Sequence, residues 1–368
     1  MDFLLSTVTA ITLKHVVMWC IGGLLIFLAI KKDMEPALLL PIGFGTILVN
    51  IPFANVLTID GEVGIIEWLF NGLIGASEAL PILLFIGIGA MIDFGPLLSN
   101  PKLFLLGGAA QFGIFITILL ASLFFPIEDA ASIGIIGAAD GPTSIVVANA
   151  LHSQFLPQIV VVAYSYMALV PVIMPPVIKL ITTKKERQIK MAYVPQSVSK
   201  STKIMFPIVV SLVAGIIAPK SLALVGFLMF GNLIRECGCL KSLSDTAQTT
   251  FANIITLLLG ITISFLMTAE GFLRLETLMI MGLGIFAFVF DIVAGVMFTK
   301  LLNLFSKNKI NPMVGAAGIS AFPMASRVVQ KMGVKEDPTN HLLMHAAGAN
   351  VSGQIASAIV GGLILGIL

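Results

Sequence analysis

Residues 103–125 read LFLLGGAAQFGIFITILLASLFF and contain no charged side chain. As an α-helix this run is long enough to cross the ~30 Å hydrocarbon core of a bilayer. Residues 276–305 form a second long apolar run. Over the whole chain 58% of residues are hydrophobic and 11% are charged, whereas a soluble domain has about 25% charged residues. These runs lack the alternation of a transmembrane β-barrel, so the sequence predicts an all-α integral membrane protein.

Apolar runs of this kind recur along the chain and predict about ten transmembrane helices. We expect them at residues 16–30, 36–55, 79–98, 103–125, 157–182, 204–218, 221–234, 250–269, 277–304 and 341–367. The stretch 61–77 is interrupted by Glu62 and Glu67, which favours an interfacial helix over a span.

Two other apolar stretches, 131–150 and 311–330, are broken by glycine, proline and polar residues. The first contains GAADG at 137–141 and the second contains the similar GAAGI at 315–319. The loop before the first stretch is acidic (PIEDAAS, 126–132), and the loop before the second is basic (SKNKI, 306–310). This contrast predicts two halves of opposite orientation, the inverted repeat common in secondary transporters.

The positive-inside rule then gives the orientation of the chain. The long polar loop 183–203 is basic and is predicted to be cytoplasmic. All the basic loops fall on that side only if both broken stretches are re-entrant. We therefore divide the chain into N-terminal helices (1–60), a first repeat (61–182), a loop with connecting helices (183–249) and a second repeat (250–368).

Asp140 is the main candidate for chemistry in the first broken stretch. It has no adjacent cation, and a carboxylate at membrane depth marks a functional site by default. Gly141-Pro142 breaks the helix beside it and frees backbone carbonyls, while Thr143 and Ser144 add hydroxyls. Oxygen ligands of these kinds suit a hard cation such as Na⁺. The alternative is an ordinary loop in which Asp140 caps a helix.

The second broken stretch offers further oxygen ligands in Asn311 and Ser320. Arg327 offers a forked, permanently charged donor that suits a carboxylate. If the intervening residues are helical, Ser320 and Arg327 lie two turns apart and face one cavity. The alternative for Arg327 is a side chain that reaches the cytoplasmic interface and marks a helix end.

The remaining polar residues of predicted spans have two readings each. Asn350, Ser352 and Gln354 lie in the last helix, where they either bind an ion or form hydrogen bonds between packed helices. Tyr164 is explained equally well by function or by an aromatic belt at the membrane interface. Asp291 interrupts the run 277–304 without an obvious partner, and its role is left open.

Several motifs together resemble the β subunit of the sodium-pumping biotin-dependent decarboxylases, the family of the oxaloacetate, methylmalonyl-CoA, glutaconyl-CoA and malonate enzymes. The resemblance extends from about residue 60 to the end of the chain. The motifs are GAADGPTSI (137–145), AYSYMALVP (163–171), GNLIRECG (231–238), NPMVGAAGISAFPMASRV (311–328) and HAAGANVSGQIASA (345–358).

The resemblance implies a membrane subunit that decarboxylates carboxybiotin, consumes one proton and exports Na⁺. It also implies sodium and proton positions at Asp140, Tyr166, Asn311, Ser320 and Asn350, a motif glycine at Gly315, and an arginine for the carboxybiotin carboxylate at Arg327. The implied partners are a carboxyltransferase α subunit, a biotin-carrier subunit, a small γ or δ membrane subunit and further copies of the chain. The implied location is the cytoplasmic membrane of a bacterium or archaeon.

Composition and symmetry also fit a second class of protein, a secondary transporter that couples Na⁺ to an organic anion held by Arg327. Co-purifying carrier and carboxyltransferase subunits would support the pump instead. A membrane scaffold without chemistry is a third reading, which Asp140 argues against. The net charge of +2 gives no indication of nucleic-acid binding.

Overall fold

The computed structural model describes residues 9–32, 35–59, 61–191, 198–306 and 308–368, and these form a helical protein. Within the described residues the only strand-like contact is an isolated bridge between Ile59 and Glu62. The main helices are α2 (Leu13–Lys32), α3 (Pro36–Val49), α4 (Ile65–Phe70), α5 (Ala79–Met91), α6 (Gly95–Ser99), α7 (Leu103–Ala110), α8 (Phe112–Ala121), α9 (Ile127–Gly134), α10 (Gly141–Ala150), α11 (Leu156–Ile181), α12 (Lys184–Arg187), α13 (Lys200–Ile217), α14 (Leu222–Cys237), α15 (Lys241–Thr246), α16 (Ala252–Ile263), α17 (Ala269–Phe272), α18 (Leu275–Phe305), α19 (Pro312–Ala316), α20 (Met324–Glu336) and α21 (Leu343–Ile367).

Short 3₁₀ and π segments continue several of these helices. They are η1 (Asn71–Gly75), η2 (Ile135–Ala138), η3 (Pro219–Ser221), η4 (Ala247–Phe251) and η5 (Ser264–Leu266).

The number of spans is lower than the ten expected from the sequence. In the described part of the chain six helices are long and apolar enough to cross a membrane, or up to eight if each of two bent pairs forms one span. One reason is that the expected span 79–98 ends early. α5 ends at Met91, and a new short helix, α6, begins at Gly95. Asp93 stabilises this start by accepting a hydrogen bond from the Gly95 N–H at 2.8 Å, and Pro96 lies in the first turn of α6.

The segment 61–77 contains α4 and η1, which form a bent pair with α5 at 67°. The segment 61–77 therefore fits a broken span or a re-entrant element as well as it fits the interfacial helix expected from the sequence. By contrast, the two expected spans at 277–304 and 341–367 correspond closely to α18 and α21.

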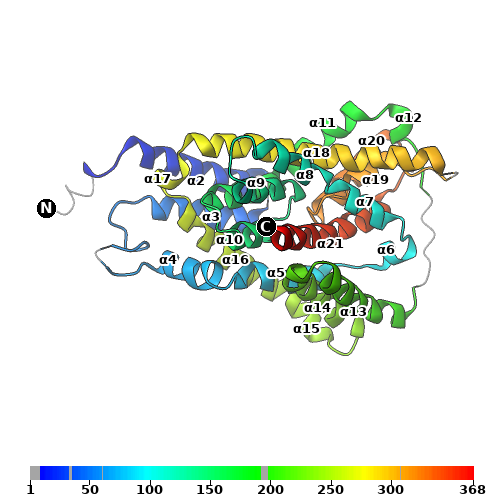
Figure 1. Cartoon of the computed structure of the whole chain (residues 1–368), viewed down its shortest axis with the longest axis horizontal. Helices are drawn as coiled ribbons and strands as arrows, with labels where there is room; N and C mark the ends of the chain where they lie inside the picture. Colours follow the sequence, from blue (N-terminus) through cyan, green and yellow to red (C-terminus); the bar gives the residue numbers. More distant parts are fainter. Residues whose placement is uncertain (1–8, 33–34, 60, 192–197, 307) are drawn as a thin grey trace.

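The molecule is elongated, and α18 follows one long edge of it (Figure 1). α2, α3, α4 and α17 lie towards one end, whereas α6, α12 and α20 lie towards the other. α10 and α21 occupy the middle. α21 packs mainly on α7, α20, η3 and α6, and it also contacts α10, so it is placed to contact both halves of the sequence.

Close helix packing depends on small residues. A Cβ on Gly231 of α14 would lie 2.0 Å from the Ile86 carbonyl oxygen of α5. A Cβ on Gly107 of α7 would lie 2.1 Å from Ser352 Oγ of α21. Small residues at such crossings let helix backbones approach closely, which is how helices associate where lipid removes the hydrophobic driving force between them.

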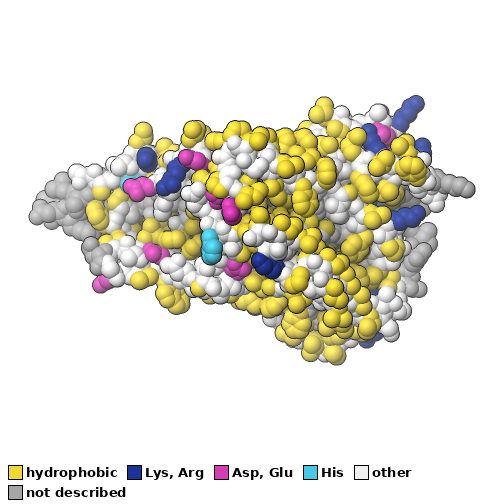
Figure 2. Space-filling model, in the orientation of Figure 1, with side chains coloured by type: hydrophobic (Ala, Val, Ile, Leu, Met, Phe, Trp, Pro, Cys, Tyr) yellow, Lys and Arg dark blue, Asp and Glu magenta, His cyan; other side chains and the backbone are white. Residues whose placement is uncertain are grey.

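The outer surface is largely apolar, as Figure 2 shows for one face of the molecule. Leu180 of α11 is 87% exposed, and Ile216 of α13 is 80% exposed. Extensive exposed apolar surface of this kind is what a bilayer would cover. The buried interior, in contrast, holds many polar side chains, and these form the candidate site.

Candidate ion and carboxylate sites

The first broken segment is the stretch α9, η2 and α10, which is interrupted between Ala138 and Gly141. Ala139 has a left-handed backbone (φ 53°, ψ 43°), an uncommon conformation for a residue with a side chain. Pro142 occupies the first turn of α10, where a missing N–H is tolerated. Asp140 is the N-cap of α10, and its Oδ1 accepts from the Thr143 N–H at 3.4 Å. The sequence prediction of a broken element is confirmed here.

Asp140 is almost completely buried, with 2% of its surface exposed. Its Oδ2 accepts from Thr143 Oγ1 at 2.7 Å and from Gln354 Nε2 at 3.0 Å, and Ser357 Oγ lies 2.9 Å away. All these donors are neutral, and no Lys or Arg pairs with Asp140 in the part of the chain that is described. Its negative charge is thus stabilised by dipoles alone, which leaves it available to a small cation.

The second broken segment is the stretch from α19 to α20. α19 ends at Ala316 and α20 begins at Met324, with the cis Phe322–Pro323 peptide bond between them. The condition for placing Ser320 and Arg327 two turns apart on one helix face is therefore not met, because the proline and its neighbours interrupt the helix. The break itself was predicted correctly.

The two broken segments touch. The Ser320 N–H donates to the Ala138 carbonyl at 2.9 Å, so the interrupted backbone of one segment binds the interrupted backbone of the other. Ser320 Oγ also donates to the Gly353 carbonyl of α21 at 3.0 Å. The inverted-repeat relation between the halves stays a prediction, but the meeting of the two segments is observed.

One face of α21 contacts both segments. Asn350, Gln354 and Ser357 follow each other at the spacing of neighbours on a helix face. Asn350 Nδ2 donates to the Ile319 carbonyl of the second segment at 2.6 Å, while Gln354 and Ser357 reach Asp140 of the first. Asn350 Oδ1 is buried and has no hydrogen-bond partner among the described residues. This orphaned oxygen is suited to a cation ligand.

The structure brings the predicted residues Asp140, Ser320 and Asn350 to the same region, and their role as a site stays a prediction. Ser357, which also reaches Asp140, is not among the residues predicted from the sequence. The helical spacing does indicate Ser357, because it lies seven residues after Asn350 and therefore on the same face of α21. Ser352, which had the same two readings as Gln354, donates instead to the Leu103 carbonyl of α7 at 2.9 Å. It therefore serves helix packing.

Two predicted ligands use their polar groups elsewhere. Asn311 is the N-cap of α19, and its Nδ2 donates to the carbonyls of Arg187 and Ile189 at 2.8 and 2.9 Å. The Tyr166 hydroxyl donates to the Met281 carbonyl of α18. The structure thus does not bring these side chains onto the Asp140 carboxylate, and their roles as ion ligands stay predictions.

Tyr164 lies closer to Asp140 than the sequence suggested. Its ring packs on Gly141, where an added Cβ would lie 2.3 Å from the ring carbon Cε1. The residue is only 2% exposed, which excludes the aromatic belt as its explanation. Its hydroxyl is buried without a hydrogen-bond partner among the residues described.

Gly315, the predicted motif glycine, packs against α18. A Cβ there would lie 2.0 Å from Thr299 Oγ1 and 2.2 Å from the Gly295 carbonyl oxygen. We expect Gly315→Ala to lower stability by about 1–3 kcal/mol, because backbone atoms of α18 would have to move. Gly282→Ala on α18 is the control, since its Cβ would meet nothing within 4 Å. Thermal unfolding of both variants in detergent measures the effect, and equal midpoints would contradict it.

Arg327 lies in the first turn of α20 and is exposed. It has no ion pair within the described ranges. Burial raises the pKa of the Glu35 carboxyl. The positive charge of Arg327 partly offsets this rise by lowering the same pKa, so the two groups are close enough to interact electrostatically. The guanidinium is therefore free to bind an added anion.

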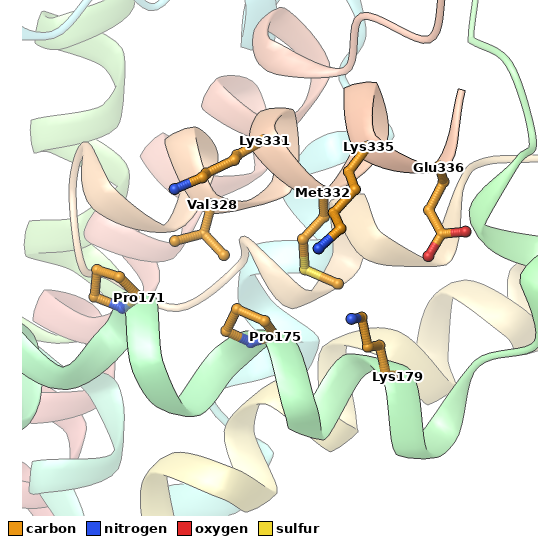
Figure 3. Close-up of a pocket in the computed structure, with 8 residues that line it drawn as sticks. All are labelled: Pro171, Pro175, Lys179, Val328, Lys331, Met332, Lys335 and Glu336. Atoms are coloured by element: carbon orange, nitrogen blue, oxygen red, sulfur yellow. The ribbon is translucent and has the colours of Figure 1, made fainter. Parts of the chain in front are cut away.

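A groove of about 220 Å³ separates α11 from α20 (Figure 3). Pro171, Pro175, Val328 and Met332 give it apolar walls, and Lys179, Lys331 and Lys335 give it positive charge. Its remaining lining residue, Glu336, is already paired with Arg187 at 2.8 Å. None of the three lysines has an ion pair among residues that the structure describes, so the groove is a site of net positive charge.

The groove continues the same helix face as Arg327. Lys331 and Lys335 follow Arg327 at intervals of four residues, which is about one helical turn each. Three cations thus line one side of α20. Arg327 is not itself a lining residue of the groove, but it lies one turn before Lys331 on the same helix.

The sequence profile of the "Na+-transporting oxaloacetate decarboxylase beta subunit" family matches residues 14–368. The methylmalonyl-CoA decarboxylase subunit β of Propionigenium modestum is 47% identical over 99% of this chain and 98% of its own. The glutaconyl-CoA decarboxylase subunit β of Acidaminococcus fermentans is 46% identical over 98% and 95%. The oxaloacetate decarboxylase β chain of Klebsiella pneumoniae is 41% identical over 99% of both.

Proposed function

The chain belongs to the family of β subunits of Na⁺-transporting decarboxylases, and we propose on this basis that it decarboxylates carboxybiotin and couples this reaction to Na⁺ export. It is a multi-pass membrane protein and the membrane part of a decarboxylase complex. The observation that carries the proposal is the buried Asp140 carboxylate, stabilised only by neutral donors at the contact between two broken segments.

We assign the Na⁺ site to Asp140 together with Asn350 and backbone oxygens of the two segments. The orphaned Oδ1 of Asn350 and the carboxylate supply two kinds of oxygen that hard cations prefer. Broken helices of transporters coordinate ions with unwound backbone carbonyls in the same way. Because α21 hydrogen-bonds to both segments, an ion bound here would fix their relative position.

We assign the carboxybiotin site to Arg327 and the basic groove beside it. A guanidinium binds a planar carboxylate through two parallel hydrogen bonds, which an ammonium group cannot do. Loss of CO₂ leaves negative charge on the ureido nitrogen, and a nearby fixed cation stabilises that charge until a proton arrives. The apolar walls of the groove suit the ring and aliphatic arm of biotin.

The lysines of the groove have a testable role in this assignment. In Lys331→Gln/Lys335→Gln we expect the KM for carboxylated carrier to rise about tenfold at low salt with kcat retained, because electrostatic attraction speeds encounter. The rise should shrink at high ionic strength. Lys300→Gln is the control, since Lys300 is paired with Glu186 at 3.0 Å outside the groove. An unchanged KM at low salt would rule out the groove as the entry route.

The partners follow from the same proposal. Biotin has to come from a carrier subunit, because the chain has no Met-Lys-Met attachment sequence. A carboxyltransferase α subunit would load the carrier, a small γ or δ subunit would join it to the membrane, and the chain would assemble with further copies of itself. Loop 183–203 would face the cytoplasm, on the side where the soluble carrier arrives.

The decisive experiment separates this pump from an anion-coupled transporter. The purified complex is placed in vesicles, and ²²Na⁺ movement is followed after addition of the acyl substrate. Sodium movement that depends on decarboxylation and on biotin supports the pump. Sodium movement by the isolated chain in response to an organic-anion gradient would support the transporter and overturn the proposal.

A further inference from the structure

A second buried carboxylate lies on α18. Asp291 has 0% exposed surface, and neither of its oxygens has a hydrogen-bond partner among the described residues. Gly113 of α8 packs directly on the carboxyl, while the N–H of the next residue, Ile114, donates to the Gln111 carbonyl at 3.2 Å. It forms no ion pair in the described part of the chain. An ionised carboxylate is very unfavourable in such a place, so a bound cation or proton has to neutralise it.

The space around Asp291 favours a proton over a metal ion. A Cβ on Gly113 would lie 2.2 Å from Oδ1, and a Cβ on Gly137 would lie 2.8 Å from Oδ2. The carboxylate is thus enclosed by the backbones of two glycines, and no side-chain hydroxyl or amide among the described residues hydrogen-bonds to it. A hard metal cation needs a shell of several oxygen ligands. A proton needs one carboxylate oxygen and no additional space.

The position of Asp291 connects it to both broken segments. Ala287, one turn earlier on α18, also packs on Gly137 of the first segment, and Gly295, one turn later, packs on Gly315 of the second. Gly137 precedes Asp140 by three residues, and the left-handed Ala139 lies between them. Any displacement of the first segment along α18 therefore changes the surroundings of both carboxylates.

We propose that Asp291 is a proton-binding site that is emptied and reloaded once per pumping cycle. The inference rests on the proposed function. When the N–CO₂ bond of carboxybiotin breaks, its electron pair stays on the ureido nitrogen, which takes up one proton. When the first segment moves away from α18, Asp291 releases one proton towards the side of the membrane where carboxybiotin is bound. The resulting carboxylate is then protonated again from the opposite side of the membrane. Proton uptake and Na⁺ movement are then linked through one element, residues 135–140.

Asp291→Asn tests this role with little change of shape. The amide is neutral, fits between the two glycines and still offers an oxygen to the N–H groups of α8, so a purely structural role is preserved. We expect normal thermal unfolding and normal Na⁺ stabilisation of the isolated chain, because Asp140 is intact. Decarboxylation by the assembled complex should fall about 100-fold, the usual contribution of a positioned proton donor.

Infrared difference spectra, which compare the complex at rest with the complex during turnover, give a second and independent measurement. The wild type should show the carbonyl band of a protonated carboxyl that weakens during turnover. This band should be absent from Asp291→Asn and present in Asp140→Asn at rest.

Normal turnover in Asp291→Asn, or a wild-type spectrum without the band, would show that Asp291 only caps α8 and would overturn the proposal. Loss of Na⁺ stabilisation in Asp291→Asn would also overturn it, by making Asp291 part of the Na⁺ site. A wild type without Na⁺ stabilisation would instead refute the proposed function itself.

Discussion

Replacement of Asp140 by asparagine is expected to weaken Na⁺ binding by on the order of 100-fold, the effect of removing one partner of a buried ion pair. The carboxylate is the only negatively charged group that hydrogen-bonds within this site among the described residues. Without it, the remaining ligands of the ion are neutral oxygens. Transport of Na⁺ by the complex should be lost with the affinity.

The fold should survive this substitution for a specific reason. The new amide would place an NH₂ group against Gln354 Nε2, which now donates to Asp140 Oδ2 at 3.0 Å. Gln354 can reverse its own amide and accept this hydrogen bond instead. The substituted side chain would also keep an oxygen for the Thr143 N–H, and asparagine is as good an N-cap as aspartate.

The measurement is the Na⁺-dependent rise in unfolding temperature of the purified chain, beside ²²Na⁺ uptake by the complex. Asp129→Asn is the matched control. Asp129 is also buried and accepts from neutral donors, Ser153 Oγ at 2.6 Å and Gln154 Nε2 at 3.2 Å, but lies in the first turn of α9. It should keep its Na⁺ response. Wild-type Na⁺ affinity in Asp140→Asn would remove Asp140 from the site.

Replacement of Arg327 by lysine is expected to lower carboxybiotin decarboxylation by about 100-fold or more, the usual effect of losing one positioned donor to a developing anion. Lysine keeps the positive charge but cannot form the paired hydrogen bonds that orient a carboxylate. The Na⁺ response of the isolated chain should change little, because the site at Asp140 does not use this side chain.

Turnover of the assembled complex and Na⁺ stabilisation of the isolated chain are measured together for Arg327→Lys. Arg235→Lys serves as the control, because its guanidinium donates to the Met91 carbonyl at 2.7 Å and so has a structural partner already. Arg235→Lys should turn over normally. Near-normal turnover in Arg327→Lys would mean that this arginine is an anchor at the membrane interface.

The parts of the fold that depend on local chemistry could be predicted from the sequence. Gly141-Pro142 and Pro323 interrupt helices through their backbone chemistry, so both broken segments were found. The burial of Asp140 agrees with its choice as a candidate, which rests on the rarity of a carboxylate without a nearby cation in a membrane. The long uninterrupted helices α18 and α21 were found from their apolar length.

The partners of these residues could not be predicted, because they depend on tertiary contacts. The expected span 103–125 corresponds to one span, Leu103–Ala121, but at Gln111 between α7 and α8 the side-chain amide reaches the Gly318 carbonyl of the second segment at 3.4 Å. Nothing local in the sequence indicates this contact. Asn311 likewise resembles an ion ligand in the sequence, but the fold brings the carbonyls of Arg187 and Ile189 to it. The 68° bend within α11 is different, because it lies one turn before Pro171 and so has a local cause in the sequence.

The two helices that touch both broken segments do so in different ways. Apart from the Asp291 carboxyl, which lies against Gly137, α18 contacts them through Ala287 and Gly295, and within the described residues no hydrogen bond joins it to Gly137 or Gly315. Such dispersion contacts are weak individually and have no preferred direction. α21 instead holds both segments by hydrogen bonds from Asn350 and Gln354. The activation barrier for moving a segment should therefore arise at α21, and the turnover rate should be more sensitive to Asn350 and Gln354 than to apolar changes along α18.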